Sequence, residues 1–260
     1  MPKSFHQQRL IINADDLGYS DPVNQAIDKA LASGLIKSST LMANAPCFSE
    51  GVAIAGRYRS EAGFGIHLNL TEFKPLSDPA LLQSLGMLNR DGCFSGCIRE
   101  LKGTPELKLA CFSELKAQIS KVESFGVKIS HFDSHHHIHT ISWMLPVIHQ
   151  LQQQHGVWKM RTTMNVYGRR LHQQPPLRRV LAKKAWVAMC RLRGSRMTEV
   201  FTGLDVFLED PSRREFQNAA SIELMCHPGQ QGYGEDLALL ERCGGVLRRS
   251  SLQLCSFNQL

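Results

Sequence analysis

Short apolar runs alternate with amphipathic segments along the whole chain. The first run, residues 9–14 (RLIINA), is rich in β-branched side chains. A polar loop and a predicted helix follow, the helix beginning with Asp21 as its N-cap and Pro22 at its first position and ending at Gly34. Similar runs recur at 39–44, 64–68, 128–132, 157–161, 222–226 and 252–257. Strands that alternate with helices in this way are typical of an α/β fold with a mainly parallel sheet of about seven strands.

Two further helices are predicted from their own apolar spacing. One covers residues 104–125 and ends at Gly126, and the other runs from about Ser142 to Gln154 and closes before Gly156. The connection between His67 and residue 104 is long and rich in Gly, Pro and Asp, as connections that cover active sites often are. No repeat or linker divides the sequence, so we expect a single domain over residues 1–260.

Composition narrows the class of protein. A chain of 260 residues with 43% hydrophobic residues can bury a sizeable core. No stretch approaches the roughly 18 to 20 consecutive apolar residues of a membrane span, and the first residues do not resemble a signal peptide. The eight cysteines lie mostly inside apolar runs, which is typical of reduced thiols. We therefore expect a cytoplasmic protein without a transmembrane segment.

The formal charge of +7 comes mostly from the segment 169–196. A solvated helix face is the preferred interpretation of this segment. Contact of residues 176–196 with a membrane surface or a lipid-linked sugar is the second. Nucleic-acid binding ranks last, because no nucleic-acid-binding fold signature accompanies the charge. The sequence leaves a homodimer open.

Polar residues stand where four of the predicted strands end. Asp15 and Asp16 follow the first run, His67 lies near the end of the third, the fourth leads into residues 130–139 (SHFDSHHHIH), and a late one is followed by His227. The carboxyl ends of parallel strands meet at one edge of a sheet or barrel, so these side chains should converge there.

Each of these signals is ambiguous by itself. Two adjacent aspartates commonly cap a helix or form a turn. His67 could be a hydrogen-bonded core residue, and His227 could simply end a strand before a Pro-Gly turn. The histidine run is more informative, because five imidazoles between residues 131 and 139 have little packing value and would repel one another if protonated. This run favours metal binding or proton transfer.

Together the signals are more specific. Two histidines and an aspartate from separate strand ends match the open sites of catalytic divalent metals. Such an ion lowers the pKa of bound water from about 15.7 to roughly 7 and polarises a carbonyl under attack. Hydrolysis then needs a carboxylate as base and an imidazole as acid. Asp15 and His227 can fill these two roles.

Four motifs resemble those of the YdjC-like deacetylases, which include chitooligosaccharide deacetylases and hopanoid-associated HpnK proteins. They are NADDLG (13–18), GIHLNLTE (65–72), HFDSHHHIH (131–139) and MCHPG (225–229), and they appear in family order. The resemblance implies a distorted (β/α) barrel related to polysaccharide deacetylases. It also implies one bound divalent ion and hydrolysis of the N-acetyl group of an amino sugar, free, in an oligosaccharide or in a glycolipid.

Matched to the motifs, the resemblance implies that Asp16, His67 and His135 hold the metal. Asp15 then becomes the general base and His227 the general acid. The metal is expected to be Mg²⁺ or Zn²⁺, with Co²⁺ and Ni²⁺ as further candidates. Residues expected to bind substrate or to support the ligands and the base are Asp133, His137, His139 and Arg161.

Two other functions remain open. Metal-dependent phosphoesterases also use Asp and His clusters on barrels, but they usually need two or three metals. Asp15, Asp16 and Asp133 supply few carboxylates for that, and no bridging Lys or Glu is evident. A non-catalytic sugar-binding protein is the third hypothesis, and the presence of acid, base and three ligands together argues against it.

Overall fold

The computed structural model describes residues 7–168, 175–232 and 235–260. Its strands are β1 (Arg9–Leu17), β2 (Ser38–Leu41), β3 (Gly63–Leu68), β4 (Ile129–Ser134), β5 (Val200–Gly203), β6 (Ser221–Cys226) and β7 (Gln253–Cys255). They form one seven-stranded sheet in the order β4-β3-β2-β1-β6-β5, and β7 pairs with the first residues of β1. All the strand pairs are parallel, which confirms the predicted α/β class.

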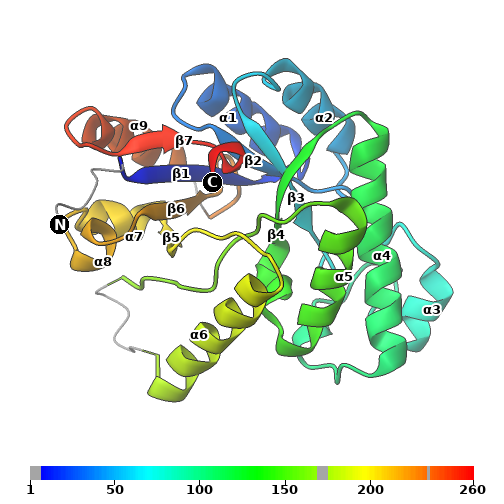
Figure 1. Ribbon diagram of the computed structural model, residues 1–260. Coiled ribbons are helices and arrows are strands. Elements are labelled where there is room, and N and C mark those ends of the chain that lie inside the picture. The colour runs from blue at the N-terminus through cyan, green and yellow to red at the C-terminus, as the bar shows by residue number, and fades with distance from the viewer. Residues whose placement is uncertain (1–6, 169–174, 233–234) are drawn as a thin grey trace.

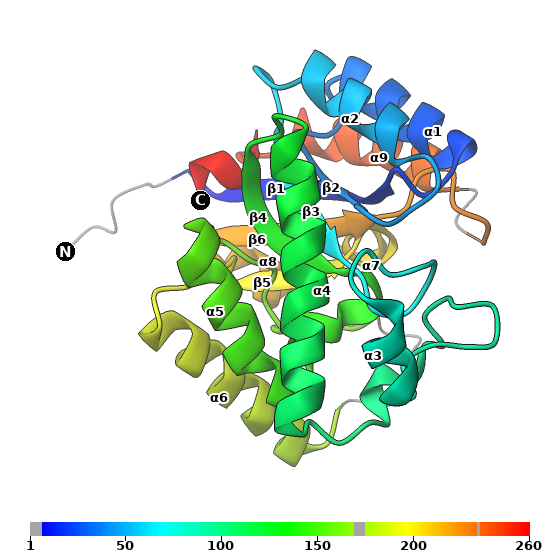
Figure 2. The same ribbon diagram turned by 90° about the vertical axis from the view of Figure 1, so that its right-hand side faces the viewer.

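Helices surround this sheet (Figure 1). They are α1 (Asp21–Ala32), α2 (Phe48–Arg57), α3 (Pro79–Ser84), α4 (Pro105–Ser124), α5 (Leu145–His155), α6 (Leu177–Leu192), α7 (Leu204–Glu209), α8 (Arg214–Gln217) and α9 (Asp236–Leu247). Helices α1, α2 and α9 lie together on one side of the sheet, α4 and α5 pack side by side on another, and α6 lies next to α5 (Figure 2).

Local chemistry explains where the predicted helices begin. The hydroxyl of Thr104 caps α4 by accepting a hydrogen bond from the backbone N–H of Leu107 at 3.2 Å, as expected for a helix over 104–125. The expected N-cap of α1 was wrong by one residue. Ser20 is extended and its carbonyl accepts the first helical bond from Asn24, so Asp21 already belongs to the helix.

The strand predicted at 157–161 is the main correction to the fold. In the described chain this segment forms only single bridges, such as the one between Met160 and Phe132 of β4. Further on, Asn165 bridges to Phe201 of β5. The segment therefore spans the gap between the two edge strands without forming a ladder. The hydrogen-bonded sheet is not closed, and only single bridges link this segment to its two edge strands.

Helix α6 accounts for most of the basic segment. Its outer face exposes Leu177, Leu181 and Leu192, while Trp186 and Val187 are buried against the rest of the protein. Residues 169–174 of the basic segment lie outside the described residues. Across the described ranges, none of the helices has the length and apolar character needed to cross a membrane.

Candidate metal and catalytic site

A β-bulge at the end of β1 positions the two aspartates. The pairing of β1 with β2 shifts register between Ala14 and Leu17, and Asp16 has a φ of 70°, which is costly for a residue other than glycine. Neighbouring side chains on a regular strand face opposite sides of the sheet. The bulge relaxes this alternation, so that Asp15 and Asp16 are both buried and line the same pocket.

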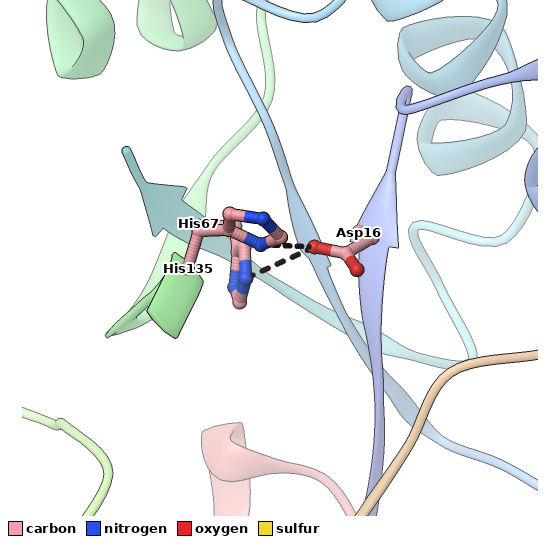
Figure 3. Close-up of side chains that lie close together, drawn as sticks. All are labelled: Asp16, His67 and His135. Atoms are coloured by element: carbon pink, nitrogen blue, oxygen red, sulfur yellow. Dashed lines mark hydrogen bonds and ion pairs between the residues drawn. The ribbon is translucent and has the colours of Figure 1, made fainter. Parts of the chain in front are cut away.

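Asp16, His67 and His135 form a compact cluster, called here the Asp-His-His cluster (Figure 3). Oδ1 of Asp16 lies 3.1 Å from Nε2 of His67 and 3.0 Å from Nδ1 of His135. Burial would raise the pKa of Asp16, but its hydrogen bonds to the two imidazoles hold that pKa well below the ordinary value. The other oxygen, Oδ2, is buried and has no hydrogen-bond partner among the described residues. A cation would satisfy it.

Asp133 fixes the orientation of the His67 ring through the nitrogen that faces away from Asp16. Nδ1 of His67 lies 2.7 Å from Oδ1 of Asp133, and the hydroxyl of Thr40 donates to the other oxygen of Asp133 at 3.0 Å. Nε2 is left facing Asp16. A carboxylate behind the imidazole is the usual arrangement of a metal-binding histidine. Asp133 thus contacts a predicted ligand directly, whereas Nδ1 of His139 contacts the hydroxyl of Ser134.

The Asp-His-His cluster suits a divalent metal better than its neighbours do. Among the residues that the structure describes, two other groups of side chains also bring their ligand atoms within 4.8 Å of one another. One combines Glu72 and His136 with the shared His135, but His136 is exposed. The other combines Asp15 and Asp133 with His67, but both of those carboxylates already bind a buried arginine. Of these three groups of described residues, the Asp-His-His cluster alone combines full burial with an unpaired carboxylate oxygen.

Arg161 is a fully buried cation shared by three carboxylates. Its Nη1 and Nη2 each donate to Asp15 at 2.7 Å, its Nε donates to Glu223 at 2.7 Å, and Nη2 lies 3.1 Å from Asp133. Of the two roles expected for Arg161, this geometry favours orienting the base. Burial would raise the pKa of Asp15, but the guanidinium keeps it far below its ordinary value, so Asp15 is ionised.

Glu223 was not among the predicted site residues. It lies in the middle of β6 and is fully buried, and burial raises the pKa of its carboxyl to about 7 although Arg161 opposes the shift. Its Oε2 has no hydrogen-bond partner in the part of the chain that the structure describes. A lone acid inside the apolar run IELMC was the signal, since such a residue needs a buried cation nearby.

His227 follows β6 and faces Asp15. Its Nε2 lies 3.9 Å from Oδ2 of Asp15, and its backbone N–H donates to Asp236 at 2.5 Å. The side chain is 15% exposed. His227, Asp15 and the Asp-His-His cluster line one pocket of about 200 Å³. The structure thus brings all five predicted metal and catalytic residues together.

Glu72 corrects one step of the sequence argument, which found no glutamate near the mouth of the site. Its Oε1 lies 3.4 Å from Nε2 of His135, and its Oε2 accepts a hydrogen bond from the hydroxyl of Tyr19 at 3.0 Å. The position of Glu72, four residues after the end of β3, was the available signal, because that strand carries His67.

The histidine run turns sharply after His135. His136 and His137 have φ values of 50° and 53°, so successive imidazoles point in different directions. Nδ1 of His136 lies 3.0 Å from the hydroxyl of Thr71, whereas the ring of His137 lies 5.6 Å from that of Phe201. His137 borders both the pocket of the Asp-His-His cluster and a larger neighbouring cavity.

Comparison with known proteins agrees with the motifs. A family model described as "YdjC-like protein" matches residues 9–244. The chain is 39% identical over 146 residues to a carbohydrate deacetylase of Geobacillus stearothermophilus, a match that spans 56% of each protein. It is 29% identical over 234 residues to a carbohydrate deacetylase of Clostridium beijerinckii, covering 85% of this chain and 81% of that one. The family predicted from the motifs is confirmed.

Solved structures share the fold. A protein of Enterococcus faecalis V583 described as a cellobiose-phosphate cleavage protein superposes with a TM-score of 0.76 at 21% identity, covering 97% of this chain and 98% of that one. A CE4 esterase of Streptococcus mutans superposes with a TM-score of 0.52 at 13% identity, covering 96% and 86%. These likenesses support the predicted relation to the polysaccharide deacetylase fold.

Proposed function

The chain belongs to the YdjC-like protein family, and from this premise we propose that it is a metal-dependent carbohydrate N-deacetylase. The reaction is hydrolysis of the acetamido group of an amino sugar to acetate and a free amine. One observation carries the proposal: the Asp-His-His cluster, with its unpaired Asp16 oxygen, shares a pocket with a buried carboxylate and a histidine. The names of the curated relatives support the reaction.

The donor set favours one subset of the expected metals. Two imidazoles and one carboxylate suit Zn²⁺, Co²⁺ or Ni²⁺, whereas Mg²⁺ prefers oxygen ligands. We therefore propose Zn²⁺ or a similar ion, held by Asp16, His67 and His135. When bound, such an ion acts as a Lewis acid toward the acetyl carbonyl and increases the acidity of water.

The remaining steps belong to side chains of this protein. Asp15, kept ionised by Arg161, accepts the proton of the attacking water. His227 lines the same pocket and donates a proton to the departing amine nitrogen. The 3.9 Å between His227 Nε2 and Asp15 Oδ2 keeps the acid and the base close to the same reacting centre.

Phosphoester hydrolysis is the second candidate, and Glu72 is the observation in its favour. Together with His135 and His136, Glu72 could hold a second ion next to the first. The names of the relatives and the ionised Asp15 favour the deacetylase. We further propose that residues 1–260 act as one domain in the cytoplasm, for which the eight free thiols give support.

Acetate release tests the proposed function. The purified protein is incubated with a panel of N-acetylated sugars, with and without a chelator, and divalent ions are then restored one at a time. We expect chelator-sensitive acetate release that Zn²⁺ restores better than Mg²⁺, with one bound ion per chain by elemental analysis. Two bound ions, phosphate released from phosphoesters and no acetate from any sugar would favour the second candidate.

A further inference from the structure

A cavity of about 860 Å³ lies at the amino end of β4, away from the proposed catalytic pocket. Ile129 and Ser130, the first two residues of β4, line this cavity, whereas Ser134, its last residue, lines the catalytic pocket. A rise of about 3.3 Å per residue separates these two ends of the strand by roughly 16 Å. None of the described residues lines both spaces, so the proposed substrate site does not account for this cavity.

Five cations from four separate segments surround this space, which is called here the basic cavity. They are Arg59, Lys128, Lys159, Arg193 and Arg196. No aspartate or glutamate is among the described residues that line the cavity, and none of the five cations forms an ion pair with a described carboxylate. Cations gathered in a hollow without acids create a positive potential that attracts anions.

The backbone holds two of these cations side by side. Lys159 and Arg196 face each other in a parallel bridge, and the N–H of Arg196 donates to the carbonyl of Trp158 at 2.7 Å. Like charges on paired strand residues are destabilising, and burial together with the charge of Arg196 lowers the pKa of Lys159. Nζ of Lys159 donates to the carbonyl of Asn258 at 2.8 Å, which positions the ammonium without neutralising it. An anion bound in the cavity would relieve this repulsion.

Trp158 gives the basic cavity an aromatic wall. Its side chain is half-buried, and its ring lies 6.0 Å from the ring of His149. The backbone of Gly194 also lies against the indole, so close that a Cβ at residue 194 would be 3.5 Å from Cε3 of Trp158. These contacts hold the indole in place beside the cations. A ligand that carries both a flat ring and negative charge would use the two features together.

Nucleotides have this combination. Arginine and lysine are usual partners of phosphate, and bases stack on aromatic side chains. A volume of about 860 Å³ also falls within the range of roughly 300 to 1,000 Å³ that is usual for small-molecule pockets. The cations surround one hollow, whereas a nucleic-acid strand is usually bound along a basic stripe. The cavity therefore favours a small polyanion.

We propose that the basic cavity binds a nucleoside diphosphate or triphosphate, with the base against Trp158 and the phosphate groups among Lys159, Arg193 and Arg196. This site is additional to the proposed function and does not depend on it, because its described lining residues take no part in the catalytic pocket.

The end of α6 offers a matched control. Arg191 lies two residues before Arg193 and is likewise exposed, but it does not line the basic cavity. Arg193→Gln therefore removes a cation of the cavity, whereas Arg191→Gln removes a neighbouring one with the same change in net charge. For the aromatic wall, Trp158→Leu removes the ring and Trp158→Phe keeps one.

The main experiment is a calorimetric titration of the full chain with ADP, pyrophosphate or adenosine at about 0.15 M salt, where exposed charges are screened. We expect ADP to bind in the micromolar range, and pyrophosphate and adenosine to bind at least about tenfold more weakly. Arg193→Gln and Arg196→Gln should each weaken ADP binding by about tenfold, while Arg191→Gln should not. Trp158→Leu should reduce the affinity for ADP to that for pyrophosphate, and Trp158→Phe should retain most of the preference.

The outcomes that would overturn the proposal are distinct. An affinity for ADP that is the same in Arg191→Gln, Arg193→Gln and Arg196→Gln would place the nucleotide elsewhere. Equal affinities for ADP and pyrophosphate would remove the role of the indole. Binding of poly(U) without binding of ADP would indicate a nucleic-acid surface instead. The titration needs no turnover, so its result stands whether or not any sugar releases acetate.

Discussion

Arg161→Lys keeps a buried positive charge but removes the planar guanidinium group that three carboxylates bind. The guanidinium makes four contacts of 2.7 to 3.1 Å with Asp15, Glu223 and Asp133. A lysine ammonium is a single point charge and cannot reach both oxygens of Asp15 and the Glu223 carboxylate at once. We therefore expect at least two of these charge-assisted hydrogen bonds to be lost.

The cost follows from the burial of the network. Hydrogen bonds to charged groups contribute about 1.5 to 3 kcal/mol each, and disrupting a buried ion pair costs about 3 to 5 kcal/mol. Because the lysine charge compensates in part, we expect the free energy of unfolding to fall by about 3 kcal/mol. For a chain of this length that lowers Tm by about 6 to 12 °C.

The assay is equilibrium unfolding in urea, with Tm from calorimetry as a second reading. The control is Arg57→Lys, because Arg57 also binds a carboxylate, that of Asp28 at 2.7 Å, but its side chain is 57% exposed. An exposed pair contributes little, so the control should lose no more than about 0.5 kcal/mol. Equal losses in the two variants would refute the view that burial makes the Arg161 network strong.

The same variant has a consequence for catalysis. Burial raises the pKa of Asp15 and Arg161 lowers it, so weakening their contact should let burial dominate. The proposed base is then protonated over a wider acidic range. We expect the acid limb of the profile of kcat/KM against pH to move to higher pH in Arg161→Lys. An unchanged limb would mean that Asp15 is not the base.

Other predictions test the site and the fold. His135→Ala should lower the metal content measured after dialysis, whereas Asp15→Asn should keep the metal and lose acetate release by about a hundredfold or more; activity that survives in Asp15→Asn excludes it as the base. The pKa of Glu223 is raised from 4.5 to about 7, so its stabilising contribution is present below about pH 4.5 and is lost as the pH rises through 7; the difference in unfolding free energy between wild type and Glu223→Gln should decline over this range, and a flat difference would show that its carboxyl does not titrate there. A methyl group on Gly65 would meet a buried imidazole of β4 at 2.5 Å, whereas one on Gly56 would meet nothing within 4 Å. Gly65→Ala should therefore cost about 3 kcal/mol and Gly56→Ala should cost nothing or stabilise slightly, as urea midpoints can show.

The alternation of apolar runs and helices was enough to predict the parallel sheet, because buried strands and capped helices are encoded locally. The alternation failed to predict the structure where pairing with a neighbouring strand determines whether a segment becomes a strand. VWKMR has the composition of a strand, yet residue 160 finds only a single bridge to β4. Strand β5 was missed because four residues, Val200–Gly203, are too few to show a pattern.

For the site, too, the sequence predicted some residues, whereas others depend on contacts that form only in the folded protein. Strand ends predicted that Asp16, His67 and His135 would converge, and the structure brings them together. The network around Arg161 could not be predicted in the same way. Its partners Asp15 and Glu223 lie 146 and 62 residues away, and only the folded sheet places them around one guanidinium. The bulge that buries both aspartates is likewise a property of strand pairing.

The sheet order has a consequence for biosynthesis. The proposed metal ligands Asp16, His67 and His135 all belong to the first 135 residues, whereas Arg161 and His227 leave the ribosome later. Strands β1 to β4 are neighbours in the sheet, so they can associate while β6, the other neighbour of β1, is still being synthesised. The proposed metal ligands are thus synthesised before the partner of the proposed base and the proposed proton donor, and the strands that carry the ligands have neighbours to pair with before β6 is made.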